Sequence, residues 1–130
     1  MGIRNERVWE GIIAFVWGVS VCVVCYYSLK PELELPVEFW SADKIYHLLA
    51  YAWLAALPIA GFRNRRTAVI ASVSMVILGA LLEIGQAFVP GRTFSLLDMT
   101  VNGVGVVAGV ICGRSARPRL KKIVPPVAAD

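Results

Sequence analysis

Charged residues are scarce in this sequence, and apolar residues are abundant. Of its 130 residues, 17% are charged and 58% are hydrophobic, whereas a soluble domain has about 25% charged and 45–50% apolar residues. The length is enough for one domain, and a core that small cannot hide so much apolar surface from water. The composition therefore argues against a soluble domain and for a protein that lies in a membrane.

Histidine and cysteine are also rare, with one His and three Cys. Cys22 and Cys25 form a C-x-x-C, but they lie in an uncharged run and no second ligand pair exists. Two small apolar side chains in a lipid-facing or packed helix explain this pair better than redox chemistry or zinc binding. Cys112 stands alone, so no disulfide framework is indicated. We expect no cofactor and no metal site with a diagnostic ligand spacing.

Long apolar runs dominate what is present. Residues 11–29 carry no charge, residues 45–62 carry one group that titrates near neutral pH, His47, residues 67–89 carry one acid, Glu83, and residues 95–113 include one acid. A membrane span needs about 20 residues, within a range of about 17–25. The sequence predicts an all-α integral membrane protein with four transmembrane helices in a compact bundle. The membrane domain would be 11–113, between a cytoplasmic N-terminus, 1–10, and a basic cytoplasmic tail, 114–130.

The distribution of Lys and Arg predicts the orientation. Ten of them lie in the N-terminus, the loop 63–66 and the tail, and three lie in the other connections, at Lys30, Lys44 and Arg92. Because basic residues favour the cytoplasmic side, both termini are predicted to be cytoplasmic. This asymmetry accounts for the net charge of +4 without a nucleic-acid partner.

Polar residues recur within or beside the apolar runs. Asp43, His47 and Tyr51 follow one another at four-residue steps, which places them on one helical face. At about 1.5 Å of rise per residue, polar groups from three separate stretches fall at similar depth in the outer half of the bilayer. We expect them to converge, with the side chain at 92 above them. The candidate functional cluster is Asp43, His47, Tyr51, Glu83, Gln86, Arg92, Asp98 and Asn102.

The energy of insertion favours a functional role for this cluster. An ionisable group in hydrocarbon costs about 2.5–3.5 kcal/mol, whereas an interhelical hydrogen bond contributes about 0.6 kcal/mol on average. Helix association alone therefore does not account for Glu83. By contrast, the small residues at four-residue steps on two of the runs indicate close packing of helices. They are Ala52, Ala56 and Ala60, and Gly105, Gly109 and Gly113.

The same polar residues resemble the motifs of the VanZ-like family. The matching pieces are Asp43-Lys44-x-x-His47-x-x-x-Tyr51, then Glu83-x-x-Gln86, then Pro90-Gly91-Arg92-x-x-Ser95-x-x-Asp98-x-x-x-Asn102-x-x-Gly105. This resemblance implies a multi-pass protein of the bacterial inner (cytoplasmic) membrane. The family is named for a protein that lowers sensitivity to teicoplanin, which implies a role in the cell envelope and specifies no reaction.

Three hypotheses about function remain open at this point. In the first, which we favour, the cluster binds a lipid-linked or anionic envelope ligand, in addition to membrane lipids, and Arg92 grips a phosphate or carboxylate. In the second, it acts on a lipid head group, with His47 and Glu83 or Asp98 as acid–base pair and Tyr51 as donor. No activated nucleophile is evident, and a metal site from Asp43, His47, Glu83 and Asp98 is geometrically possible. In the third, the bundle is structural. The oligomeric state is left open.

Overall fold

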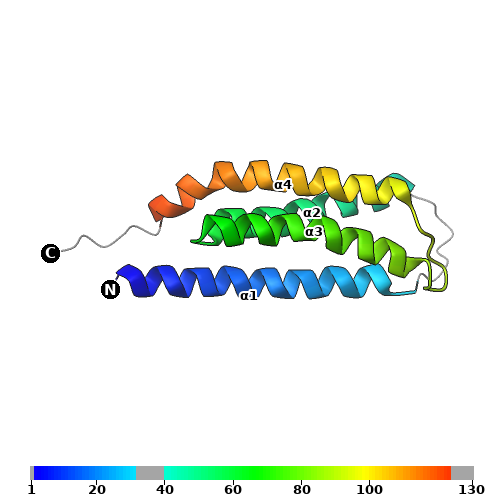
Figure 1. The fold of residues 1–130 in the computed structure, drawn as a ribbon, viewed down its shortest axis with the longest axis horizontal. Coiled ribbons are helices and arrows are strands. Elements are labelled where there is room, and N and C mark those ends of the chain that lie inside the picture. Colours follow the sequence, from blue (N-terminus) through cyan, green and yellow to red (C-terminus); the bar gives the residue numbers. More distant parts are fainter. Residues whose placement is uncertain (1, 32–39, 124–130) are drawn as a thin grey trace.

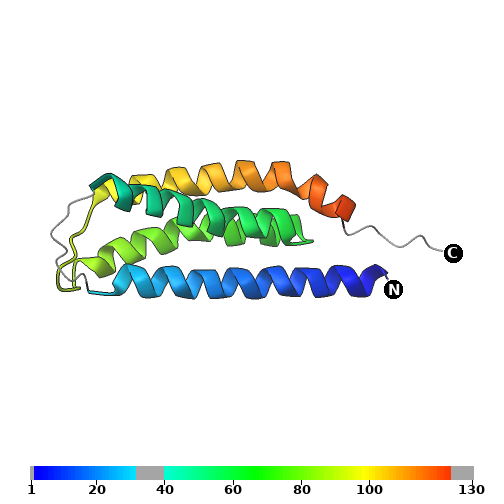
Figure 2. The ribbon, with the colours of Figure 1, turned by 180° about the vertical axis from the view of Figure 1, so that it is seen from behind.

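The described part of the chain forms four helices, which run side by side along one axis (Figures 1 and 2). The computed structural model describes residues 2–31 and 40–123, with the side chains of 7–31 and 43–117. The helices are α1 (Gly2–Leu29), α2 (Trp40–Gly61), α3 (Arg65–Gln86) and α4 (Leu96–Ile123). The described ranges contain no strand, which confirms the all-α prediction. The start of α1 and the end of α4 lie at the same end of the bundle.

Three of the four helices are long and apolar enough to cross a membrane. They are Arg7–Leu29 in α1, Arg65–Gln86 in α3 and Leu96–Arg117 in α4. The described part of α2 does not meet the same standard of apolarity, because its first turns carry Asp43, Lys44 and His47. The fourth span, predicted over residues 45–62, therefore stays a prediction.

The helix bounds differ in detail from the predicted spans. Asn64 caps α3, accepting hydrogen bonds from the N–H groups of Arg66 at 2.9 Å and Thr67 at 3.3 Å, a typical helix N-cap. α3 ends at Gln86, and a turn follows in which Gly91 has φ 80°, a conformation that favours glycine. α4 continues through the basic segment to residue 123. Residues 32–39 of the first loop and 124–130 of the tail lie outside the described residues. The division into 1–10, 11–113 and 114–130 stays a prediction.

α2 is the central helix, and it packs against α1, α3 and α4. Tyr51, Leu54 and Ala55 of α2 form a buried cluster with Met75 of α3 and Val106 of α4. A helix covered by neighbours on several sides does not need the uniformly apolar surface of a lipid-facing helix. This position explains how α2 carries Lys44 and His47, which contact Asp98 and Asn102 of α4.

Glycines allow α4 to lie against the backbone of α2. A Cβ on Gly105 would lie 2.6 Å from the carbonyl oxygen of Leu48, and one on Gly113 would lie 2.7 Å from that of Ala56. A Cβ on Gly109 would collide with the backbone of Ala52. The prediction that small residues mediate helix packing is thus confirmed for this pair of helices.

Pro58 sets the contacts of α2 with its other neighbours. A proline has no N–H, so the carbonyl of the residue four positions earlier has no partner within the helix. That residue is Leu54, and its oxygen accepts a hydrogen bond from Trp17 Nε1 of α1 at 2.9 Å. The adjacent carbonyl of Ala55 accepts one from Ser72 Oγ of α3 at 2.8 Å. Side chains of two other helices therefore bond the α2 backbone around the proline.

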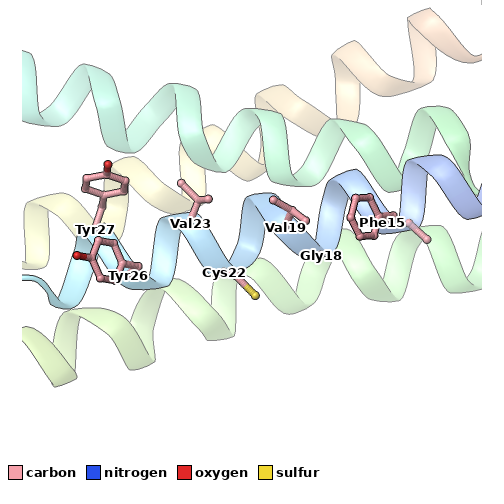
Figure 3. A pocket seen from close by; sticks show the side chains of 8 residues that line it. Phe15, Gly18, Val19, Cys22, Val23, Tyr26 and Tyr27 are labelled. Carbon is pink, nitrogen blue, oxygen red and sulfur yellow. The ribbon is translucent and has the colours of Figure 1, made fainter.

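The outward face of the bundle is apolar. Phe15 of α1 is 72% exposed, and Ile77 of α3 and Val107 of α4 are similarly exposed. On α1, Phe15 borders a shallow hollow of about 510 Å³ that is lined by residues of α1 alone (Figure 3). Cys22 also lies at this surface, and it is a free cysteine. A surface of this kind fits contact with lipid acyl chains.

Candidate functional site

The centre of the candidate site is a hydrogen bond between α2 and α4. His47 Nδ1 lies 3.0 Å from Asn102 Oδ1. The amide oxygen can only accept, so His47 Nδ1 carries the hydrogen, and in the neutral imidazole Nε2 carries a lone pair. Asn102 is 2% exposed, which fixes the orientation of the ring. His47 Nε2 then faces Asp43, with 3.8 Å between Nε2 and Oδ1.

A second contact joins the same two helices near their N-terminal ends. Lys44 Nζ of α2 lies 3.1 Å from Asp98 Oδ1 in the first turn of α4. Asp43, His47 and Asp98 each place one side-chain N or O atom within 4.8 Å of those of the other two. The structure therefore brings together residues that are more than 50 positions apart in the sequence.

Glu83 of α3 bonds the start of α4. It is 1% exposed, and its Oε2 accepts a hydrogen bond from the N–H of Ser95 at 3.2 Å. Ser95 Oγ in turn accepts from the N–H of Asp98 at 3.2 Å, so Ser95 is the N-cap of α4. In a capping box the side chain three residues later accepts from the N-cap N–H. Here the residue three positions later is Asp98, which pairs with Lys44 instead. The acceptor for the N–H of Ser95 is Glu83, which comes from α3.

Glu83 also belongs electrostatically to the α2–α4 cluster. Its carboxyl group lies within electrostatic range of Asp98, His47 and Asp43. The predicted convergence of Glu83 with His47 or Asn102 stays a prediction. The specific hydrogen bond of Glu83 goes to the backbone of Ser95, which the sequence spacing did not indicate.

Gly79 allows α3 to pack closely against two members of the candidate cluster, Tyr51 and Asn102. A Cβ on Gly79 would lie 3.1 Å from the ring of Tyr51 and 3.3 Å from Asn102 Nδ2. Tyr51 is 1% exposed, and it lies within electrostatic range of Glu83. The face of α3 that carries Gly79 and Glu83 thus points into the bundle.

Gln86 and Arg92 contact the end of α1, a helix that sequence reasoning left out of the site. Gln86 Nε2 donates to the carbonyl of Ser28 at 3.2 Å. Arg92 donates through Nη2 to the carbonyl of Tyr27 at 3.1 Å and through Nε to that of Lys30 at 3.3 Å. The last carbonyls of a helix have no partner within it, so Arg92 caps α1. The C-terminal end of every helix leaves carbonyls that need donors, so a donor is expected there. No sequence spacing indicates that the donor lies more than 60 residues away.

A cavity of about 560 Å³ lies between α1 and α2 beside this cluster. Four of the eight candidate residues line it, namely Asp43, His47, Tyr51 and Arg92. Glu83, Gln86, Asp98 and Asn102 are not among its lining residues and are buried. Sequence reasoning missed the remaining lining residues, which are mostly apolar or aromatic: Val24, Tyr27, Ser28, Tyr46 and Ala50.

A helical bundle with three membrane-span-like helices, an apolar outward face and a buried polar layer near one end defines a multi-pass helical membrane protein. The chain belongs to the VanZ/LLP1 family, whose model matches residues 5–117. The match covers every residue of the candidate cluster and confirms the resemblance noted from the motifs. No curated protein and no solved structure matches the chain significantly.

Proposed function

We propose that this VanZ/LLP1 protein binds an anionic amphiphile, a lipid-linked or other cell-envelope ligand, in the cavity between α1 and α2. The observation that supports this most is the lining of the cavity. Asp43, His47 and Arg92 provide polar and charged groups, and Val24 and Ala50 provide apolar surface. A lining of this mixed kind suits a ligand with both a head group and a chain.

The order of residues along the helices separates the two kinds of lining. α1 runs toward the end of the bundle where α2 begins, so Val24 lies about 6 Å deeper than Ser28 at the usual helical rise. Ala50 lies about 10 Å deeper than Asp43 by the same rise. The head group would therefore lie beside Arg92 and Asp43, and the chain would extend along Val24 and Ala50. Arg92, with its planar guanidinium, suits a phosphate or carboxylate.

The membrane setting is part of the same proposal. α2 crosses the membrane as a fourth span, shielded by its neighbours, with both termini in the cytoplasm of a bacterial cell and the cavity near the outer surface of its inner membrane. The 10-to-3 distribution of basic residues supports this orientation. A ligand held there belongs to the cell envelope, which would connect this protein to glycopeptide sensitivity, including sensitivity to teicoplanin.

The experiment that tests ligand binding is mass spectrometry of the amphiphiles that co-purify with the full chain. Wild type is compared with Arg92→Ala and with a matched control, Arg117→Ala. Arg117 also caps a helix end, donating to the carbonyls of Ile59, Phe62 and Arg63 at distances of 2.9–3.2 Å, and it does not line the cavity. We expect an anionic amphiphile with wild type and Arg117→Ala, and its loss with Arg92→Ala.

A second variant tests the cavity without touching a charge. Ala50→Trp adds a large side chain to a lining residue that is half-buried, so it should exclude the chain of the ligand and lower its occupancy. The same amphiphile at the same amount in wild type, Arg92→Ala and Ala50→Trp contradicts the proposal.

A further inference from the structure

We propose that Asp43, His47 and Asp98 form a binding site for a divalent transition-metal ion, in the wall of the cavity at the polar end of α2 and α4. Metal binding here needs no amphiphile, so this inference is independent of the proposed function. It also departs from the expectation of no metal, which rested on the absence of a diagnostic spacing in the sequence.

The separations of the three side chains suit a shared ion. Their N and O atoms lie within 4.8 Å of one another. Two ligand atoms that are each about 2.1 Å from one metal ion lie about 3–4 Å apart. His47 Nε2 and Asp43 Oδ1 are 3.8 Å apart, too far for a hydrogen bond and within that interval. Shifts below about 1 Å would bring all three atoms into ligating positions.

The imidazole distinguishes this site from a cluster of acids. A metal-ligating histidine usually donates its other ring N–H to a carbonyl or carboxylate, which fixes both tautomer and ring orientation. His47 has this arrangement, because Nδ1 pairs with Oδ1 of the buried Asn102 at 3.0 Å. The lone pair on Nε2 is left directed toward the carboxylate of Asp43. Asn102 acts here as a positioning residue.

Charge also favours a cation at this place. Asp43 and Asp98 are two carboxyl groups beside one imidazole, and the carboxyl group of Glu83 lies within electrostatic range. Lys44 Nζ lies on Asp98 at 3.1 Å, so an ammonium group already neutralises one prospective ligand. A divalent ion would replace Lys44 on that carboxylate, and Lys44 would therefore compete with the metal.

The donor set indicates the class of ion. Two carboxylates and one imidazole suit ions such as Mn²⁺, Fe²⁺ and Zn²⁺. Three protein ligands leave coordination positions for water or an anionic group. Asp43 and His47 line the cavity, so these positions would open into it.

The test is Mn²⁺ binding by the full chain, carrying a tag without histidine, in nanodiscs of zwitterionic lipid. Mn²⁺ prefers oxygen and imidazole to thiolate, so the cysteines do not compete. Binding is measured by electron paramagnetic resonance, and ligation is detected as spin-echo modulation from ¹⁴N. His47 is the one histidine of the chain, so an imidazole signal can arise only from it.

We expect one Mn²⁺ per chain with an imidazole signal. His47→Gln and Asp98→Asn should each weaken binding by about tenfold or more, and His47→Gln should abolish the signal. Glu10→Gln is the control. It alters an acid that accepts a hydrogen bond from the N–H of Arg63 at 3.0 Å, far from the site, and it should bind like wild type.

Lys44→Met keeps the proposal testable if the other variants fold poorly, because removal of the competing ammonium should tighten Mn²⁺ binding. No binding by wild type, equal binding by His47→Gln, no nitrogen signal, or no gain in affinity with Lys44→Met overturns the proposal.

Discussion

His47 on α2 and Asn102 on α4 are joined by a hydrogen bond of 3.0 Å. These residues are 55 positions apart in the sequence, and the bond links two helices whose backbones also touch along a row of glycines. It fixes which nitrogen of the imidazole carries the hydrogen. The position of the ring in the polar layer thus depends on α4.

We expect Asn102→Leu to destabilise the protein by about 1–3 kcal/mol, because the N–H of His47 Nδ1 loses its acceptor in a partly buried place. The measurement is thermal unfolding of the purified protein in detergent. Thr100→Val is the control, since Thr100 is exposed on the same helix and bonds only the carbonyl of Leu96 in the part of the chain described. Equal unfolding temperatures for the two variants argue against a structural role of the bond.

Replacement of Glu83 separates its capping role from chemistry at the carboxylate. Glu83→Leu removes the acceptor for the N–H of Ser95, so we expect a loss of about 1–3 kcal/mol of stability. Glu83→Gln keeps an acceptor oxygen and should fold normally. If the protein binds its ligand without catalysis, amphiphile retention by Glu83→Gln should fall partially. Complete loss of function at normal abundance points instead to acid–base catalysis.

The packing of α2 against α4 predicts that a large side chain destabilises the protein at Gly109 and is tolerated at Gly103, on the same helix. Gly109→Leu should prevent the close approach of α4 to Ala52, and so lower membrane abundance and unfolding temperature. Gly103→Leu should be tolerated, because a Cβ there meets no atom within 4 Å. Immunoblots of membranes and thermal scans check both. A normal level and unfolding temperature for Gly109→Leu contradict the observed contact.

Arg92→Lys should loosen the end of α1. Arg92 bonds two carbonyls of α1 through separate nitrogens of one planar group, and the ammonium of lysine lacks this geometry. We expect faster hydrogen exchange near residues 27–31 and weaker retention of the amphiphile, with normal membrane level and topology. Arg117→Lys, the control, should increase exchange at the α2–α3 turn instead. Full amphiphile retention by Arg92→Lys means that charge alone suffices at this position.

The orientation can be tested with a reporter enzyme that is active only outside the cytoplasm. Fused after Arg119 it should be inactive, and inserted between α1 and α2 it should be active, because basic residues gather at the predicted cytoplasmic end. An active reporter after Arg119 refutes the predicted topology.

The fold was largely readable from the sequence because apolar length and charge distribution report directly on insertion into lipid. The run at 95–113 gave the weakest span by this reasoning, because it is free of charge only over 99–113, yet α4 is long and apolar enough to cross a membrane. The described part of α2, which the sequence treated as a clear span, is the one that does not meet that standard. Lys44 and His47 in its first turns contact Asp98 and Asn102 of α4, so composition alone understates how well α2 fits in the bundle.

The candidate site was only partly readable. The four-residue steps of Asp43, His47 and Tyr51 gave the shared face on α2. The roles of Glu83 and Arg92 were not predictable, because each bonds a backbone group of a distant helix end, Ser95 for the former and Tyr27 and Lys30 for the latter. Side-chain spacing carries no information about such backbone partners. For the same reason, the sequence did not predict that α1 contributes to the site.

Pro58 has a consequence for the order of assembly. In lipid a backbone carbonyl without a donor costs several kcal/mol, and the carbonyl of Leu54 depends on Trp17 of α1 while that of Ala55 also accepts from Ser72 of α3. If α2 crosses the membrane as proposed, it would leave the first of these without a partner in hydrocarbon when inserted alone. We would then expect α2 to be stable in lipid only when α1 is already beside it, with α3 completing the arrangement. α1 and α2 should accordingly leave the translocon as a hairpin, with the indole of Trp17 already on Leu54.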